Sequence, residues 1–303
     1  EKDNAEILKW GEKNSFDFDV KDHIELGKAL DILDFERGTK ISGSGFPLYK
    51  GKGAKLERAL INFMLDEQSK NGYKEVMTPV LVNRASMEAA EKIPKFEEDM
   101  YHIEKDDLFA IPTAEVPILN IHRDEILKQD ELPLKYCGFT NCFRREAGSF
   151  GKDVRGLNRV HQFEKVELVQ IAHPDKSYAV LDEMVNHVEK LLNTLELPYR
   201  ILRLCGGDMS FASALTYDFE VYSAAQERWL EVSSVSNFEA FQSNRMKIRY
   251  KDSNGKSQLV HTLNGSSLAL PRIIACLLEN NQFGGGINLP AAIHSYFGGP
   301  SIS

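Results

Sequence analysis

The chain has 303 residues, 42% of them hydrophobic and 27% charged, and its formal net charge is −8. These values are typical of a globular protein, and no apolar run approaches the roughly 20 residues that cross a bilayer. The acidic balance excludes a generally basic surface, so any contact with nucleic acid has to be local.

The four cysteines show neither a Cys-x-x-Cys pair nor an accompanying His-x-x-x-His pattern. Because these spacings mark zinc sites and redox pairs, we expect reduced, buried thiols, no zinc and a cytoplasmic location. The residues after Glu1 show no signal-peptide pattern, so none is expected in this stretch.

Periodicity and turn residues predict a first group of elements before residue 84. A short helix is expected over His23–Phe35 and a strand over Pro47–Lys50. A strand over Glu75–Asn83 contains Pro79, which favours a sheet edge, a bulge or an interface. Between these two strands, one helix ending at Asn71-Gly72 carries apolar residues at i, i+3, i+4, i+7 and i+8, namely Leu56, Ala59, Leu60, Phe63 and Met64.

The rest of the chain is richer in strands. Helices are expected over Val116–Leu127, over residues 178–195 and over Leu268–Asn281, the last opened by residues 264–267, and the final 20 residues are expected to wrap the surface. The predicted strands are Leu134–Phe143, Phe163–Ile171, Tyr199–Leu204, Thr216–Tyr222, Trp229–Val235 and a hairpin of Lys247–Tyr250 with Gln258–Thr262. Hairpin-joined strands with packed helices predict an α+β fold built on a mainly antiparallel sheet.

The stretch Thr140–Gln170 is the most informative part of the chain. It reads as two strands joined by a loop that contains Gly148, Gly151 and Gly156 with the cations Lys152, Arg155 and Arg159. Alternation puts Phe163, Lys165 and Glu167 on one face of the second strand, and Arg144 and Glu146 on one face of the first. A guanidinium, a ring and a carboxylate that converge are able to bind a nucleotide and an amine. Spacing alone favours the alternative, a salt-bridged hairpin with a core phenylalanine.

Three other segments contain candidate site residues. Glu231 and Ser234 offer oxygen ligands to Mg²⁺, but simple alternation puts them on opposite faces, so their joint use requires a bend. Arg272 is a cation near a helix N-terminus, a conflict that a bound phosphate would resolve. For Thr113 and Glu115, which follow Pro112, the alternative is a helix cap.

Together these segments resemble the class II aminoacyl-tRNA synthetases, in the form found in the seryl-tRNA synthetase family. Residues 140–170 are similar to motif 2, residues 72–83 to motif 1, and residues 262–272 to motif 3. Residues 111–116, Ile-Pro-Thr-Ala-Glu-Val, resemble the serine-binding segment of that family. The likeness extends over the whole chain in the same order, which is far more specific than any single motif.

The resemblance implies a six- to seven-stranded, mainly antiparallel sheet flanked by helices, in one catalytic domain over 1–303 with a connecting segment over 1–50. It implies a homodimer that uses ATP and Mg²⁺ to activate L-serine and then transfers the seryl group to tRNA(Ser). Residues 149–158 would approach the tRNA acceptor end.

The resemblance also implies a role for individual residues. Arg144, Glu167 and Arg272 would be catalytic, and Glu231 and Ser234 would hold Mg²⁺. The serine-binding set would be Thr113, Ala114, Glu115, Arg144, Glu167, Asn264 and Ser266. The ATP-binding set would be Arg144, Arg145, Glu146, Arg159, Val160, His161, Gln162, Phe163, Glu231, Val232, Ser233, Ser234 and Arg272.

The family normally carries an N-terminal coiled-coil arm that grips its tRNA, and this sequence has no heptad run. We therefore expect a catalytic core that activates serine but charges tRNA weakly unless an arm is fused upstream. Two alternatives stay open: a paralogue that loads an amino acid onto a carrier protein, and a non-catalytic regulatory relative. The first tends to use cysteine-ligated zinc, and the matching segments here contain no such cysteine. The second would be free to lose Arg144, Glu167, Glu231 and Arg272, all of which are present.

Overall fold

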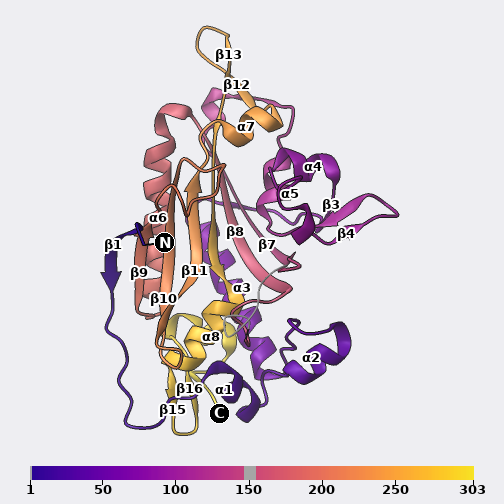
Figure 1. The fold of residues 1–303 in the computed structure, drawn as a ribbon. Helices are drawn as coiled ribbons and strands as arrows, with labels where there is room; N and C mark the ends of the chain where they lie inside the picture. Colours follow the sequence, from indigo (N-terminus) through magenta and orange to yellow (C-terminus); the bar gives the residue numbers. More distant parts are fainter. Residues whose placement is uncertain (1, 147–154) are drawn as a thin grey trace.

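A mainly antiparallel eight-stranded sheet forms the centre of the computed structural model, which describes residues 2–146 and 155–303 (Figure 1). In spatial order its strands are β1 (Ala5–Trp10), β9 (Tyr199–Arg203), β10 (Leu215–Ser223), β11 (Arg228–Asn237), β14 (His261–Ala269), β8 (Gln162–Ala172), β7 (Leu134–Phe143) and β2 (Lys74–Glu75). In this sheet β2 runs parallel to β7, and the other described pairings are antiparallel. The α+β prediction is confirmed, with two short edge strands beyond the core of the sheet.

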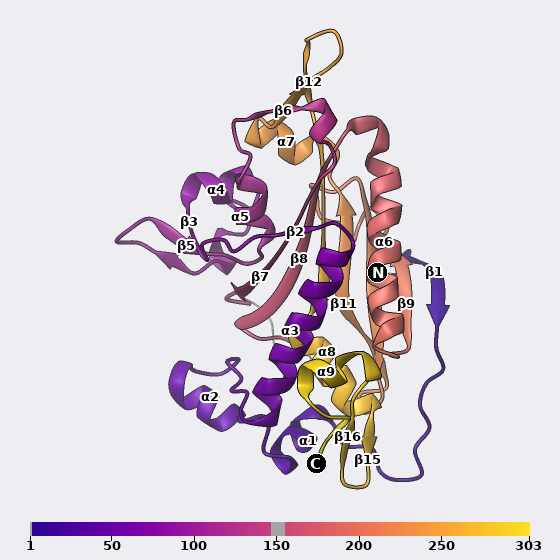
Figure 2. The ribbon, with the colours of Figure 1, turned by 180° about the vertical axis from the view of Figure 1, so that it is seen from behind.

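Two long helices, α3 (Lys52–Lys70) and α6 (Ser177–Thr194), cover the same face of the sheet, which is the face turned toward the viewer in Figure 2. The predicted apolar stripe of α3 is buried, with Leu56, Leu60 and Met64 fully covered. Helix α3 ends at Lys70, where the N–H of Asn71 closes the last turn. Helices α1 (His23–Ala29) and α8 (Leu270–Asn280) pack against each other near the end of the sheet.

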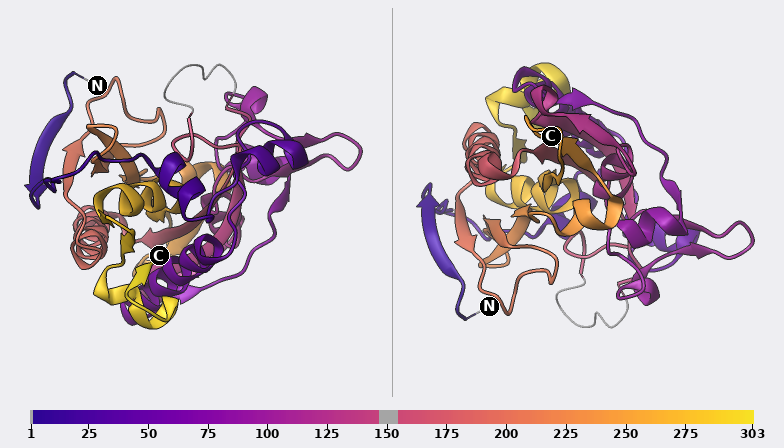
Figure 3. Two further views of the ribbon diagram at one scale, coloured as in Figure 1. Left: turned by 90° about the horizontal axis from the view of Figure 1, so that it is seen from below. Right: turned by 90° about the horizontal axis from the view of Figure 1, so that it is seen from above.

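A lateral group of elements surrounds a second core beside β7 and β8. Its purple part, residues 81–120, projects to one side of the sheet in Figure 3. The lateral group comprises β3 (Leu81–Asn83), α4 (Arg84–Ala89), β4 (His102–Ile103), β5 (Leu108–Ala110), α5 (Glu115–Asn120), β6 (Ile126–Lys128), α7 (Phe241–Met246), β12 (Arg249–Lys251) and β13 (Ser257–Leu259). This group forms one wall of the site described below.

Several predicted elements are wrong or incomplete. The helix over 116–127 ends at Asn120, and residues 126–128 form β6, because they pair with β12. Residues 264–267 belong to β14, because both β11 and β8 pair with them. The strand expected over Glu75–Asn83 is divided into β2 and β3 on either side of Pro79.

The two ends of the chain also differ from the prediction. Near the N-terminus, β1 and α2 (Phe35–Ser42) were not predicted, and the strand expected over Pro47–Lys50 contributes a single bridge between Leu33 and Tyr49. Near the C-terminus, β15 (Gln282–Phe283), β16 (Gly286–Asn288), α9 (His294–Phe297) and β17 (Ser301–Ile302) are part of the folded body. Ile287 and Ile302 are fully buried there, so this segment does more than wrap the surface.

A carboxylate pair between α3 and β8 makes the stability dependent on pH. Burial and the neighbouring Glu164 raise the pKa of Glu57 from 4.5 to about 9. Between these values the folded state binds a proton that the unfolded chain releases, so the free energy of unfolding falls as the pH rises. We expect Glu57→Gln to be more stable than the parent at pH 8, by on the order of 2 kcal/mol, and no more stable at pH 4.5. Urea denaturation across this range, with the exposed Glu88→Gln as control, measures the difference; parallel pH profiles for parent and Glu57→Gln would contradict it.

Candidate active site

Alternation along β8 divides its side chains between a core face and an open face. Val166 and Leu168 are buried in the core that α3 and α6 cover. Phe163, Lys165 and Glu167 therefore lie on the opposite face, as predicted, and each lines a cavity there.

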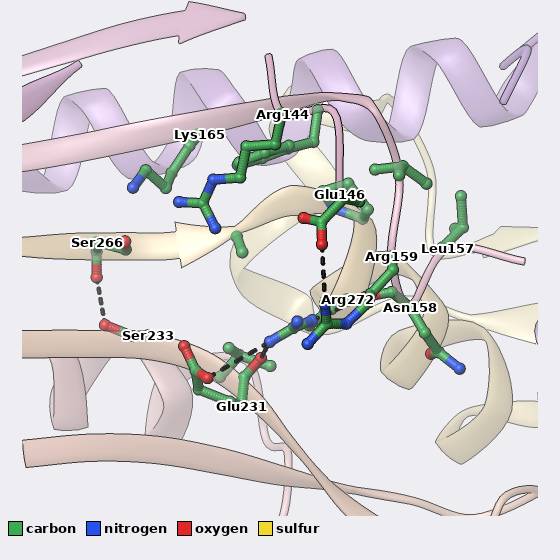
Figure 4. A pocket seen from close by; sticks show the side chains of 15 residues that line it. Arg144, Glu146, Leu157, Asn158, Arg159, Lys165, Glu231, Ser233, Ser266 and Arg272 are labelled. Carbon is green, nitrogen blue, oxygen red and sulfur yellow. Dashed lines mark hydrogen bonds and ion pairs between the residues drawn. The ribbon is translucent and has the colours of Figure 1, made fainter. Parts of the chain in front are cut away.

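The first cavity has a volume of about 230 Å³ and lies at the ends of β7, β8 and β11 (Figure 4). Its lining includes ten of the predicted site residues: Arg144, Glu146, Arg159, Val160, Phe163, Glu231, Val232, Ser233, Ser266 and Arg272. The guanidinium of Arg272 donates to the carbonyls of Asn158 at 3.1 Å and Glu231 at 2.6 Å. The arginine near the start of α8 is thus held in place by backbone oxygens and faces the cavity.

Ion pairs in this cavity agree in part with the salt-bridge interpretation. Arg159 contacts Glu146 at 2.8 Å, across the loop that joins β7 and β8. The guanidinium carbon of Arg144 lies 5.1 Å from the centre of the Phe163 ring. Both interactions are at least partly exposed, so neither forms part of a closed core, and both leave the groups accessible to a ligand.

The second cavity, of about 470 Å³, adjoins the first and extends toward the lateral group. Nine predicted site residues line it: Thr113, Glu115, Arg144, Glu146, Arg159, Glu167, Ser234, Asn264 and Ser266. Lys165 contacts Oε2 of Glu167 at 2.6 Å, and the hydroxyl of Thr113 donates to the same oxygen at 3.3 Å. Because both of these contacts from the described residues use Oε2, Oε1 of this buried carboxylate is the oxygen that we assign to a cationic ligand.

A buried polar network holds Glu115 at the base of the second cavity. Its Oε1 accepts from Gln242 at 2.6 Å and from Asn264 at 2.9 Å, and its Oε2 contacts Lys92 at 3.0 Å. Gln242 also donates to Glu91, whose pKa burial raises to about 7. Because both carboxylate oxygens are bonded, the side chain of Glu115 has a fixed orientation. The hydroxyl of Thr113 also accepts from the backbone N–H of Glu115, as a helix cap would.

The bend that Glu231 and Ser234 require is present as a β-bulge. The register between β10 and β11 shifts between Phe219 and Glu220, so Val232 has no partner opposite. Glu231 then lines the first cavity and Ser234 the second. On β10, opposite Ser234, burial and the Glu231 carboxylate raise the pKa of Asp218 to about 7.

Four predicted site residues line neither cavity. Ala114 is fully buried, and Gln162 begins β8. Arg145 donates to the carbonyl of Glu98 at 3.2 Å, while the ring of His161 stacks on Phe46. Of the predicted tRNA-contacting residues 149–158, those up to 154, including Lys152, lie outside the described residues, as do Gly148 and Gly151.

Comparison with known proteins agrees with this geometry. Residues 95–281 match the family described as tRNA synthetase class II core domain (G, H, P, S and T). A serine–tRNA ligase from Salinibacter ruber is 56% identical over 300 residues, which are 98% of this chain and 70% of that protein. The chain belongs to the serine–tRNA ligase family.

Two solved structures of serine–tRNA ligases show the same fold. The Pyrococcus horikoshii seryl-tRNA synthetase complexed with ATP matches with a TM-score of 0.96 and 35% identity, covering 100% of this chain and 72% of that one. The Naegleria fowleri cytoplasmic serine–tRNA ligase in complex with AMP matches at 0.95 and 30% identity, covering 100% and 73%. The eight-stranded sheet described above is therefore the class II catalytic fold.

Some residues of this serine–tRNA ligase core were not predicted to belong to the site. Lys165 was placed on the correct face, and its position between Phe163 and Glu167 was a sufficient signal. Lys92 and Gln242 had none, because they reach Glu115 from segments distant in the sequence. In the described part of the chain, no group of three or more His, Cys, Asp and Glu side chains is arranged to hold a metal, and no helix is long and apolar enough to span a membrane.

Proposed function

We propose that the chain activates L-serine with ATP and transfers the seryl group to tRNA(Ser), and that Arg144 connects the two substrates. The observation that supports this most directly is that two adjoining cavities share Arg144, Glu146, Arg159, Lys165 and Ser266. One cavity is rich in arginine and has an aromatic ring, as a nucleotide requires. The other contains buried carboxylates and hydroxyl groups, as an amino acid requires.

In the first step, an oxygen of the serine carboxylate attacks the α-phosphorus of ATP in line, and the bond to the pyrophosphate oxygen breaks. Arg144 would hold the carboxylate and the α-phosphate together by its bidentate fork. Phe163 would stack on the adenine and Glu146 would accept from its amino group. Arg159 and Arg272 would neutralise the distal phosphates. Catalysis then rests on positioning and on fixed positive charge, with no covalent enzyme intermediate.

Serine would lie in the second cavity, with its ammonium group on Glu167 and its hydroxyl group beside Ser266. Both side chains are nearly inaccessible to solvent. Alanine keeps the ammonium group but lacks the hydroxyl, so it would leave the buried Ser266 without its partner, which a buried polar site penalises strongly. This is the basis on which we infer specificity for serine.

A magnesium ion fits beside Glu231 and Ser234. Asp218, opposite Ser234, has a buried Oδ1 with no hydrogen-bond partner in the described structure, and all three side chains offer the hard oxygen ligands that Mg²⁺ prefers. When bound, the ion would neutralise charge on the phosphates, whose oxygens and water would complete its coordination.

In the second step, a hydroxyl group of the 3′-terminal ribose of tRNA attacks the seryl carbonyl carbon, and AMP leaves. We infer that residues 51–303 carry this machinery and that residues 1–50 act as a connecting segment, since every residue that lines the two cavities lies after residue 90. Residues 149–158 would approach the acceptor end.

Serine-dependent exchange of pyrophosphate into ATP tests the proposed function. We expect the 303-residue chain to catalyse exchange with serine and to give little with alanine, threonine or glycine. Absence of exchange from the folded protein would contradict an enzymatic role. Adding tRNA or a carrier protein to the activated enzyme then distinguishes a tRNA ligase from a carrier-protein ligase.

We also propose a homodimer formed through the segment that contains β2 and β3. Met77 is 94% exposed, and Val80 and Leu81 beside it are 36% and 42% exposed, which is unusual for neighbouring apolar residues. We expect Met77→Glu to convert a dimer into monomers in analytical ultracentrifugation, because a charge would have to be buried at the interface. Ile41→Glu, at a 71% exposed residue of α2, is the control. A Met77→Glu variant that sediments like the parent would place the interface elsewhere.

A further inference from the structure

Two exposed phenylalanines from distant segments meet at the mouth of the second cavity. Phe96 precedes the short helical turn Glu97–Asp99, and Phe211 lies between β9 and β10. Their ring centres are 6.3 Å apart with an interplanar angle of 40°. Phe96 is 37% exposed and Phe211 is 46% exposed. Each ring therefore leaves part of its apolar surface in contact with water next to the site, and a ligand that stacked there would bury that surface.

Phe211 is held in position by a contact with α7. Its ring packs edge-on against Phe241 of α7 at 5.9 Å. The guanidinium carbon of Arg245 lies 4.5 Å from the centre of the Phe241 ring. Phe211 is thus oriented by the lateral group, although it covers no part of the hydrophobic core.

Cations gather around these rings on a chain whose net charge is −8. The ammonium group of Lys95 lies 4.0 Å from the centre of the Phe211 ring and 5.5 Å from that of Phe96. Arg145 reaches the same turn and donates to the carbonyl of Glu98. The turn also carries three carboxylates: Glu97, which pairs with Arg84 at 2.9 Å, followed by Glu98 and Asp99. Aromatic rings interleaved with lysine and arginine are the usual surface for single-stranded nucleic acid.

The location of the pair specifies which part of a nucleic acid would reach it. Phe96 and the neighbour of Phe211, Ser210, line the same cavity as Glu167 and Ser266. The 3′-terminal nucleotide whose ribose reacts with an amino acid in this cavity would enter through this mouth. A base at the 3′ end would then lie beside the two rings. We propose that Phe96 and Phe211, with Lys95, form a stacking platform for an unpaired base at the 3′ end of tRNA. This inference rests on the proposed function.

An alternative role for the same contact is a latch that closes the cavity over serine. The two roles affect different steps. A platform acts on tRNA binding and on transfer, whereas a latch acts on serine affinity during activation. Exchange of pyrophosphate requires no tRNA, so the two measurements separate them.

The test uses a tRNA(Ser) transcript with 2-aminopurine at its 3′-terminal nucleotide, whose fluorescence is quenched on stacking. For Phe211→Leu we expect quenching to be lost, the Kd and the half-saturating tRNA concentration for single-turnover transfer to rise about 10-fold, and exchange to change less than 2-fold. Phe211→Trp should restore quenching, because the stacking surface is retained. Phe283→Leu, at a 40% exposed phenylalanine of β15, is the matched control.

The outcomes are distinguishable. A raised KM for serine in exchange with unchanged tRNA binding would show a latch and overturn the platform. Unchanged behaviour of Phe211→Leu in all assays would also overturn it. If the parent chain itself shows no exchange, the proposed function fails, and this result is independent of the variants.

Discussion

Replacing Arg144 by alanine is expected to lower serine-dependent pyrophosphate exchange by about 10³-fold, the scale of losing a fixed charge that acts in the transition state. Arg144 lines both cavities, and no other described arginine except Arg159 does so. The guanidinium contacts the Pro112 carbonyl at a long 3.4 Å and the Phe163 ring. Its contribution to folding is therefore small, and we expect the melting temperature to stay within about 2 °C of the parent.

Exchange rates and thermal unfolding on the same preparation measure both quantities. Arg37→Ala is the control, because Arg37 is an exposed arginine of α2 whose ion pair with Asp34 is remote from the site. A large loss of stability in Arg144→Ala would support the salt-bridged hairpin that spacing alone favoured.

The second large effect is expected for Glu167→Gln, which should raise the KM for serine about 100-fold and leave the KM for ATP nearly unchanged. The buried carboxylate is the group we assign to the ammonium of serine, and an amide would lose the charge that makes this contact strong. The variant should also lose stability, by about 3 kcal/mol, since it leaves the buried Lys165 without its counter-ion.

A double variant separates these two consequences. Lys165→Met with Glu167→Gln removes the unpaired charge, so most of the lost stability should return while the KM for serine stays high. If the double variant recovers serine affinity, Glu167 acts only as the partner of Lys165. Urea denaturation and exchange at varied serine concentration provide the two readouts.

The sequence was most informative where local pattern and tertiary contacts agree. The apolar stripe of α3 and the bounds of β7 were predicted correctly because periodicity 3.6 and periodicity 2 are properties of the segment itself. The open face of β8 followed from the same alternation, and motif resemblance then assigned its residues to substrates.

What could not be predicted depends on distant partners. Residues 264–267 look like a helix start, and only pairing with β11 and β8 makes them a strand. The bulge at Val232 depends on the register against β10, which no pattern within β11 reveals. Lys92 reaches Glu115 from the segment after α4, and Gln242 reaches it from α7, so their part in the site emerges only in three dimensions.

The division of β8 into a core face and an open face has a consequence for how reliably the site is assembled. Slipping this strand by one position would turn Lys165 and Glu167 into the apolar interior and Val166 and Leu168 into the polar cavities. Such a chain would lose the burial that keeps it folded. The apolar residues of β8, which contact no substrate, therefore select the one strand register in which the site residues are correctly aligned, and a molecule that reaches its native state has this alignment.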